Sequence, residues 1–425
     1  MKKVLLLAAA AAATTCSYGA GFGIYEASAR GNAMGGAVIG DTHDATAAYH
    51  NPANLAFATN IMVSAGGTFI LPYCDVEVDH RSQNRMNPGW FFVPTFYATI
   101  PLPFDFTFGW GNYTEFGLGT KYGKNWDLAG DTQETTMEQM TFNPNLAYKV
   151  TDWWSVAAGI RGSYIHFNNH KQPFYGDMFA PVPGYPPIAT ADLHSRLNGD
   201  DWGMGWNAAM TLKPTEDLTI GLVYRSMIRH KIGGTFDLGG NVYGPGGMLL
   251  SSLREHQRAS AKLRLPESLT LGVNYNVTKR YRVGSSVTYT RWSSLDKIAF
   301  KIGGGHSYTQ QFDWRDTVRV GFGMEYDFLD WLTGRLGYTF DEDPTKKHHE
   351  STMLPAGDRH IIGTGLGFKI TDNLTLDLGY NFIRMNNEHY DVTYSSGQYG
   401  ETNTKRMSCR NGFSHLISAT LSYAF

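Results

Sequence analysis

From Thr59 to the end of the chain, apolar and polar residues alternate in short runs, which are separated by breaks of two kinds. The short breaks are polar turns at 101–105, 151–152, 214–217, 277–280, 329–330 and 371–373. The long breaks are polar stretches at 73–89, 117–137, 168–199, 231–257, 296–313, 343–357 and 387–411. Long and short breaks follow one another in strict alternation. An up-and-down outer-membrane barrel has this arrangement, with short turns at the periplasmic end and long loops outside.

These breaks divide the chain into about fourteen strands, an even number as in bacterial single-chain barrels. In the last strand, Ser414, Ser418 and Thr420 share one face, and apolar residues share the other. We therefore predict an all-β fold, a 14-stranded antiparallel transmembrane β-barrel over residues 59–425 with both termini periplasmic. A soluble sandwich also alternates, but the aromatic residues near strand ends, with Phe425 as the last residue, favour the membrane.

The first nineteen residues have the features of a secretory signal peptide. Lys2 and Lys3 precede an apolar stretch, and Ser17-Tyr18-Gly19 is a small-x-small cleavage site. No later window has the ~20 consecutive apolar residues of a membrane-spanning helix. The signal peptide and the barrel pattern together predict the outer membrane of a Gram-negative cell. We also expect the protein to be a monomer. Its expected partners are membrane lipid, lipopolysaccharide and the barrel-assembly machinery. A net charge of -2 disfavours nucleic acid as a partner.

Residues 20–58 form the one long segment after the signal peptide that does not alternate. The segment is rich in Gly and Ala and ends in Asn51-Pro52-Ala53. Small residues suit a compact segment packed against a wall, because Gly lets the backbone approach its neighbours closely. We predict a hatch that plugs the barrel lumen over residues 20–58. A flexible N-terminal leader is the alternative.

Strand parity assigns a set of charged residues to the lumen. They are Arg161, Arg225, Lys262, Arg264, Arg319, Glu325, Arg335 and Asp377. A guanidinium binds a carboxylate through two hydrogen bonds, so these cations predict a carboxylate site for an amphipathic ligand, with Arg161 and Arg225 as the leading candidates. The alternative is that the charges pair with one another or hold the hatch.

Short motifs recur in order from the hatch to the C-terminus. They lie at 51–53, 202–207, 224–226, 265–267, 289–293, 316–319, 340–344, 354–359 and 423–425. Their order and spacing resemble the FadL family of outer-membrane long-chain fatty-acid transporters. The resemblance implies a plugged fourteen-stranded barrel that is not an enzyme. It also implies capture of a hydrophobic ligand at the outer loops, an internal pocket, and lateral release through the wall into the bilayer.

Two sets of residues are candidates for steps of that route. Gly109, Gly111 and Gly117 interrupt the third strand, where Gly often marks a bulge, and predict the wall defect. Simple barrel curvature is the alternative. The loop at 168–199 is unusually apolar and predicts a capture groove, although it could instead fold over the barrel mouth. Its candidate residues are Phe174, Tyr175, Met178 and Phe179.

Cys74 and Cys409 are the two cysteines that remain after the signal peptide. They lie near the ends of the first and last strands, which barrel closure makes neighbours. We therefore predict a disulfide, with two free thiols as the alternative. No cofactor or metal is expected, because His348 and His349 are more typical of a solvated loop. A general porin and a surface adhesin remain the competing functions.

Overall fold

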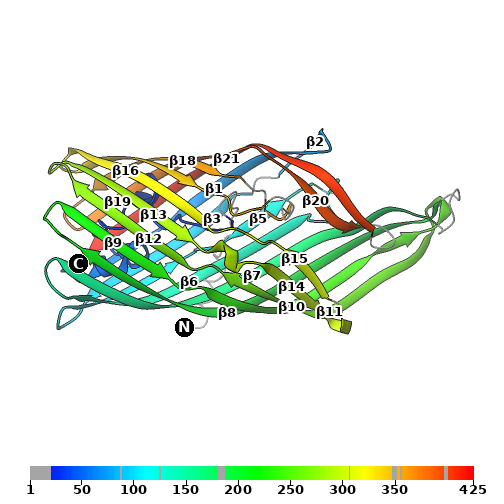
Figure 1. Cartoon of the computed structure of the whole chain (residues 1–425), viewed down its shortest axis with the longest axis horizontal. Coiled ribbons are helices and arrows are strands. Elements are labelled where there is room, and N and C mark those ends of the chain that lie inside the picture. Colours follow the sequence, from blue (N-terminus) through cyan, green and yellow to red (C-terminus); the bar gives the residue numbers. More distant parts are fainter. Residues whose placement is uncertain are drawn as a thin grey trace.

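The computed structural model describes residues 21–86, 89–123, 126–179, 187–305, 307–346, 352–354, 357–396 and 401–425. The predicted signal peptide therefore lies outside the described residues, as do His348 and His349. The described chain forms one continuous antiparallel sheet that closes on itself around a short helical N-terminal segment (Figure 1). The helices of this described part are all too short and polar to cross a membrane.

Fourteen strands form the closed ring, which confirms the predicted strand number. In ring order they are β1 (Met62–Val78), β3 (Phe91–Pro101), β4 (Phe106–Tyr113), β6 (Glu134–Lys149), β7 (Trp154–Phe179), β8 (Pro187–Leu212), β9 (Leu218–Arg225), β12 (Ser268–Asn276), β13 (Tyr281–Thr290), β16 (Thr317–Leu329), β17 (Leu332–Asp341), β18 (Arg359–Lys369), β19 (Leu374–Met385) and β21 (Glu401–Ala424). The ring closes where β21 pairs with β1, from Met62 opposite Ala424 to Val78 opposite Met407.

Seven further strands extend the wall at the end where the long connections lie. They are β2 (Arg81–Arg85), β5 (Leu118–Lys121), β10 (Ile228–Tyr243), β11 (Leu249–Leu265), β14 (Lys297–Ile302), β15 (Ser307–Gln311) and β20 (Glu388–Ser396), with the short helices η2 (Pro245–Gly247), η3 (Trp292–Ser294) and η4 (Gly303–Gly305). The expectation of polar loops at 168–199 and 231–257 is therefore wrong. β7 pairs with β8 and β10 pairs with β11 along most of these stretches. Most residues at 234–257 are exposed or half-buried on both faces of the sheet, so pairing there leaves no apolar–polar alternation in the sequence.

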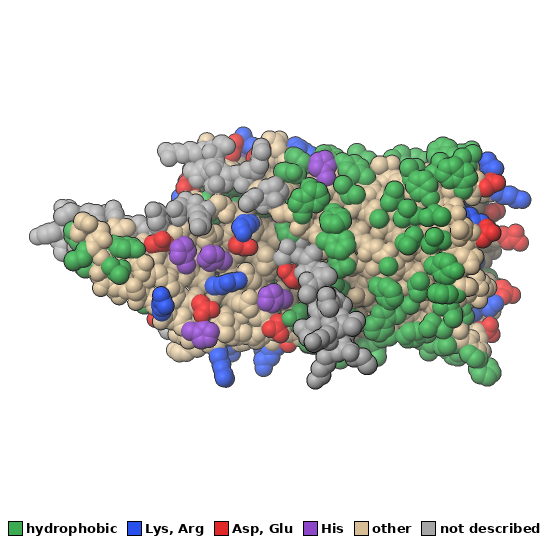
Figure 2. Space-filling view, turned by 180° about the vertical axis from the view of Figure 1, so that it is seen from behind, with side chains coloured by type: hydrophobic (Ala, Val, Ile, Leu, Met, Phe, Trp, Pro, Cys, Tyr) green, Lys and Arg blue, Asp and Glu red, His purple; other side chains and the backbone are tan. Residues whose placement is uncertain are grey.

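A band of apolar side chains covers the face of the ring that Figure 2 shows, and exposed apolar residues occur on strands all around the ring. Phe322, Leu336, Ile362 and Leu421 are exposed within it, each by more than 40 %. Charged side chains gather at the short-turn end and again beyond the band toward the long connections (Figure 2). A soluble sandwich would bury such a surface, whereas lipid tails cover it in a membrane.

The N-terminal segment fills the lumen near the short turns (Figure 1). Helix α2 (Ala29–Ala33) contacts β17, β18, β19 and β21, while η1 (Pro52–Phe57), which follows α3 (Ala47–His50), contacts β4, β6, β7 and β8. Glycines on the inner wall allow this close packing. A Cβ atom on Gly321 would lie 2.2 Å from the Gly35 carbonyl oxygen. The C-terminus lies at the short-turn end, where the Phe425 amide donates to the Ile61 carbonyl, whereas Gly21 lies inside the ring against Trp292 and Trp314.

Candidate functional site

An apolar pocket of about 30 Å³ lies in the lumen on the long-connection side of the N-terminal segment. Its lining has no charged side chain. The lining residues are Phe22, Leu118, Met137, Phe167, Ile232, Ala261, Leu263, Ile298, Phe300, Phe312, Trp314, Met353 and Leu354. These side chains come from the N-terminal segment, from six strands and from the connections between them. A wholly apolar lining at this position suits a hydrophobic molecule.

Phe22 lies among aromatic rings beside this pocket. Its ring centroid lies 4.9 Å from that of Trp292, 5.6 Å from that of Trp314 and 5.8 Å from that of Phe116. Both indole N–H groups are buried and have no hydrogen-bond partner among the described residues. An N–H without a partner in an apolar environment is costly. A bound molecule with an acceptor oxygen could relieve this cost.

The wall is interrupted between β4 and β5. The chain bends inward there, and Phe116 pairs with Gly23 of the N-terminal segment in an isolated bridge. The Ile24 amide donates to the Glu115 carbonyl at 2.8 Å, and the Gly117 amide donates to the Phe22 carbonyl at 2.9 Å. Among the described residues, β5 pairs with β6 alone, and the ladder between β3 and β4 ends at Phe96. The first residues of β3 therefore have no strand beside them on that side.

Gly117 of the predicted wall defect lies at this bend, and its role as an opening stays a prediction, whereas the pairing of Gly109 and Gly111 contradicts a defect at those two residues. Gly109 and Gly111 are fully paired, opposite Asn145 and Asn143 of β6. A Cβ atom on Gly109 would lie 2.3 Å from Leu55 of η1, and a Cβ atom on Gly111 would lie 2.8 Å from the Tyr113 ring. Gly109 makes room for the N-terminal segment at the wall, while the break follows from the inward bend at residues 114–117.

Glu115 lies at the centre of the arginines that parity placed in the lumen. The Nη2 atom of Arg161 donates to its carboxylate at 2.5 Å, and the Nε atom of Arg225 lies 3.5 Å away. Arg161 also donates to the Ser226 carbonyl, and Arg225 donates to the Tyr49 carbonyl. The structure therefore matches the alternative in which these charges pair with each other and hold the N-terminal segment.

Arg225 and Arg319 also line a small polar cavity of about 60 Å³ between the N-terminal segment and β12 and β13. The Arg319 guanidinium lies 4.2 Å from the ring centroid of Tyr25, and that of Arg225 lies 4.7 Å from the ring of Tyr49. Both rings belong to the N-terminal segment, so cation–π contacts help to seat it.

Lys262 and Arg264 do not face the lumen, so their assignment by parity is wrong. Both are exposed on β11, while Ala261, Leu263 and Leu265 between and beside them are buried. The apolar face of β11 points inward because this part of the strand forms the wall of the apolar pocket. The usual rule of apolar residues outside and polar residues inside holds only within the lipid layer.

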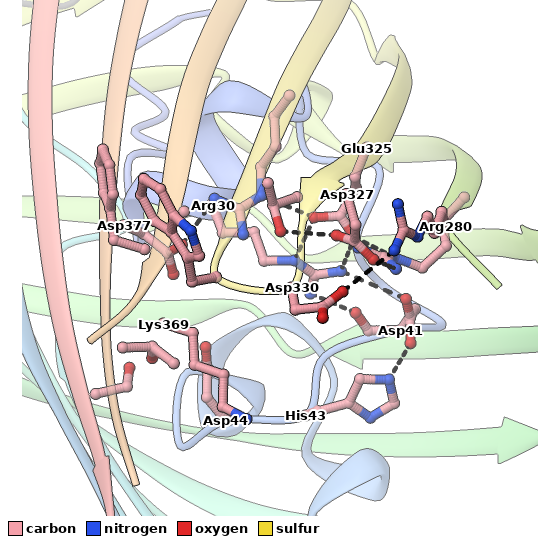
Figure 3. Close-up of a pocket in the computed structure, with 18 of the residues that line it drawn as sticks. Arg30, Asp41, His43, Asp44, Arg280, Glu325, Asp327, Asp330, Lys369 and Asp377 are labelled. Carbon is pink, nitrogen blue, oxygen red and sulfur yellow. Dashed lines mark hydrogen bonds and ion pairs between the residues drawn. The ribbon is translucent and has the colours of Figure 1, made fainter. Parts of the chain in front are cut away.

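At the short-turn end, the lumen opens into a wide vestibule of about 930 Å³ that is lined by charged groups (Figure 3). Glu325 is its most connected residue. Its carboxylate binds Arg30 of α2 at 2.7 Å, Arg335 at 2.7 Å and Arg282 at 3.1 Å. Arg335 continues to Asp377 at 2.7 Å. These ion pairs join the N-terminal segment to β13, β16, β17 and β19.

Burial and nearby charges shift the pKa values of two groups in the N-terminal segment, Asp41 and His50. Burial opposes ionisation of Asp41, but the hydrogen bond and charge of His43, together with Arg30, lower the pKa of Asp41 to about 2. Burial, with the charges of Arg225, Arg30 and Arg319, lowers the pKa of His50 to about 3. His50 is therefore neutral at pH 7, where its Nε2 atom and the Ser28 hydroxyl share a 2.8 Å hydrogen bond.

Asn51, Pro52 and Ala53 fix the end of the N-terminal segment. The Asn51 side chain accepts from the Ala53 amide as the cap of η1, and donates to the Ile39 carbonyl at 3.0 Å and to Thr211 at 2.8 Å. Pro52 stands at the first position of η1, where its missing N–H costs nothing. The motif therefore has a structural role.

The predicted capture residues Phe174, Tyr175, Met178 and Phe179 lie in the outer part of β7, which pairs there with β8. The rest of that apolar stretch, at 180–186, lies outside the described residues. The predicted capture groove stays a prediction.

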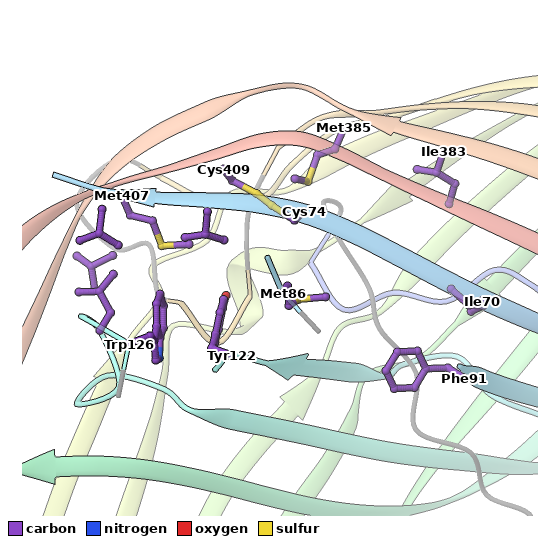
Figure 4. Packing of buried hydrophobic residues seen from close by; sticks show 14 of the residues in the cluster. Ile70, Cys74, Met86, Phe91, Tyr122, Trp126, Ile383, Met385, Met407 and Cys409 are labelled. Carbon is purple, nitrogen blue, oxygen red and sulfur yellow. A yellow bond between two sulfur atoms is a disulfide. The ribbon is translucent and has the colours of Figure 1, made fainter. Parts of the chain in front are cut away.

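The two cysteines lie in the outer part of the ring, where Cys74 and Cys409 form a disulfide with sulfur atoms 2.10 Å apart (Figure 4). They are surrounded by buried apolar residues, including Met86, Met385 and Met407. No group of three potential metal ligands occurs in the part of the chain that the structure describes.

The family described as outer membrane protein transport protein (OMPP1/FadL/TodX) matches residues 10–425. The chain belongs to this family. It is therefore a transport protein of the Gram-negative outer membrane and not an enzyme, as predicted. The long-chain fatty acid transport protein of Escherichia coli O6:H1 is 25% identical over 399 residues, covering 87% of this chain and 88% of the relative. Outer membrane protein P1 of Haemophilus influenzae is 24% identical over 451 residues, covering 96% and 95%.

Solved structures show the same fold. A FadL homologue of Pseudomonas aeruginosa superposes with a TM-score of 0.80 at 22% identity, covering 95% of this chain and 100% of that one. The toluene transporter TodX of P. putida superposes with a TM-score of 0.73 at 18% identity, covering 94% and 99%.

The apolar pocket residues on β10, β11 and β14 were missed by the sequence analysis. Ala259, Ala261, Leu263 and Leu265 alternate as clearly as any strand. The alternation of apolar residues was therefore visible in the sequence. Whether these residues face the lumen or the outside depends on whether that part of the strand meets lipid.

Proposed function

We propose that this protein takes up hydrophobic compounds, fatty acids or small aromatics, through the apolar pocket and releases them sideways into the bilayer. The observation that carries the proposal is the pocket itself, a wholly apolar space in the lumen of a protein that belongs to a transport family. Relatives are named for long-chain fatty acid and for toluene transport, so both ligand classes are open.

In this proposal, Phe22 moves when the ligand enters. The pocket has room for only one or two water-sized groups, so a lining side chain must leave. Phe22 is the candidate because it belongs to the N-terminal segment rather than to a wall strand. Burying an acyl chain gains about 0.8 kcal/mol per CH₂, which offsets loss of the Phe22 packing.

The exit in this proposal is the break between β4 and β5. The bend at residues 114–117 pairs with the same residues that carry Phe22, through the Gly117 amide and the Phe22 carbonyl. A shift of Phe22 therefore disturbs the bend directly. The ligand would then pass beside the unpaired part of β3 into lipid and avoid the charged vestibule, where an apolar chain gains nothing.

Uptake by a transporter-deleted host tests the function, with Leu263→Asp as the variant and Lys262→Asp as its matched control. Leu263 faces the pocket and its neighbour Lys262 faces outward. A buried carboxylate in the pocket opposes an apolar ligand, so Leu263→Asp should abolish uptake of radiolabelled oleate or toluene, while Lys262→Asp should leave it unchanged. Unchanged uptake by Leu263→Asp would contradict the pocket.

A general porin is the competing function, and conductance separates the two. The N-terminal segment fills the lumen, and Arg161 and Glu115 close its middle. The protein should therefore show little steady ion conductance in planar bilayers. A large, steady conductance of the intact protein would favour a porin.

A further inference from the structure

Three basic side chains lie together on the outer face of the wall, just beyond the apolar band. His360, Arg384 and His415 belong to β18, β19 and β21. His360 stands directly opposite Arg384, and His415 stands opposite Phe382, two residues from Arg384 on the same face. Cross-strand neighbours of this kind lie within reach of a single ligand.

The two histidines are held in the same way by tyrosines. The Tyr338 hydroxyl and the His360 Nδ1 atom are 2.7 Å apart, and the Tyr380 hydroxyl and the His415 Nδ1 atom are also 2.7 Å apart. When the phenol donates to Nδ1, the neutral ring carries its proton on Nε2, which becomes a donor. Among the described residues, neither Nε2 atom has a hydrogen-bond partner, and Arg384 has no ion pair.

The residues below these donors place them at the lipid boundary. Ile362 and Ile417, each 52% exposed, follow on the same faces of β18 and β21 toward the short turns. Asp358 and Glu388 lie on the other side, farther toward the long connections, and Asp358 accepts from the Asp343 amide. The basic groups therefore form a single layer between apolar residues and acidic ones.

Another part of the wall, at the outer ends of β9, β12, β13 and β16, differs at the corresponding boundary. Arg291 is bound there by Glu267 at 3.0 Å, which also accepts from Tyr224, and Asp316 accepts from Tyr289. That side is self-paired, with two carboxylates for one guanidinium. The side chains of His360, Arg384 and His415 differ from this self-paired group, because no carboxylate of the described residues binds them.

We propose that His360, Arg384 and His415 bind a phosphate group of lipid A in the outer leaflet. Long loops of bacterial barrels face the outside, so the basic layer meets that leaflet where acyl chains end and phosphates begin. Arginine binds phosphate through two parallel hydrogen bonds, and the two Nε2–H groups complete the donor set. Neighbouring Tyr338 and Tyr380 suit the edge of the acyl layer, as aromatic residues do at membrane interfaces.

Native mass spectrometry of the detergent-purified full chain tests this, with bisphosphorylated lipid A as the probe. The variants are Arg384→Ala and the triple change His360→Ala, Arg384→Ala, His415→Ala, and Arg291→Ala, beyond the end of β13, is the matched control. Charge-assisted hydrogen bonds are each worth enough that the triple variant should bind lipid A at least about tenfold more weakly. Arg384→Ala should be intermediate, and Arg291→Ala should bind like the unmodified protein.

Two further probes identify the chemistry. Dephosphorylated lipid A should bind the unmodified protein as weakly as bisphosphorylated lipid A binds the triple variant, and free inorganic phosphate should not compete at millimolar concentration. Equal binding of both lipids, or of the triple variant and the unmodified protein, would overturn the proposal, as would competition by free phosphate. Unchanged thermal unfolding of the triple variant shows that lost binding is not lost fold.

Discussion

The two halves of the lumen are built from opposite chemistry. Near the short turns, Glu325 and its arginines join the N-terminal segment to the wall by ion pairs. Near the long connections, Phe22, Leu263 and Phe300 line a pocket without a charge. Charged groups that are fully paired fix a segment in one arrangement, whereas apolar contacts can be exchanged for those of a ligand. We infer that the charged half holds the N-terminal segment in place and that the apolar half binds the ligand.

Among the changes that test this difference, substitution of Glu325 should have the largest effect on stability. In Glu325→Gln, Arg30, Arg282 and Arg335 lose the charge that they share. Breaking a buried ion pair costs about 3–5 kcal/mol, so thermal unfolding should shift strongly and proteases should cut within residues 21–58. Asp330→Asn is the control, because Asp330 is exposed and pairs with Arg280 at the surface. It should change the free energy of unfolding by less than about 0.5 kcal/mol. Equal effects of the two variants would show that the charged half does not hold the N-terminal segment.

The outer half should depend instead on its covalent link. Removal of the Cys74–Cys409 disulfide by Cys74→Ser should cost about 2–4 kcal/mol. Intact-mass measurement after alkylation, with and without reductant, checks the bond itself. Alkylation of both thiols without reductant would show that the bond is absent.

A fall in pH should destabilise the folded protein, because His50 becomes protonated. Its pKa in the folded protein is about 3, below the usual 6.5, so folding loses free energy as the pH falls from 6.5 toward 3. At pH 5 the loss is about 2 kcal/mol. His50→Gln keeps a polar partner for Ser28 without titrating, so its thermal stability should change less over this range. If the thermal stability of the unmodified protein and of His50→Gln changed equally with pH, protonation of His50 would not be the cause of the loss.

The smallest expected effect is that of Asn51→Ala. The variant loses the η1 cap and two hydrogen bonds to Ile39 and Thr211, which together are worth about 1–2 kcal/mol. Thermal unfolding measures the loss. Because the motif only seats the N-terminal segment, binding of a hydrophobic ligand to the purified protein should persist. A complete loss of binding in a folded Asn51→Ala protein would give the motif a direct role.

The ring could be predicted because lipid imposes one apolar face on each strand and because turns alternate in length. The same rule misplaced Lys262, since β11 crosses from the lipid layer to the outer part of the wall, where the apolar face turns inward. Glu115 was missed although it lies in the strand expected before the break at 117–137 and has the parity of the inward-facing residues of β4. Its partners Arg161 and Arg225 were identified, but which carboxylate they bind depends on an inward bend that no local pattern encodes.

A crystal structure of the protein soaked with a brominated fatty acid or bromobenzene tests the division of the lumen most directly. The account predicts anomalous bromine density among Leu263, Phe300 and Trp314, with Phe22 displaced and the Glu325 ion pairs intact. Bromine density confined to the lipid-facing surface or to the charged vestibule, with Phe22 in place, would contradict it.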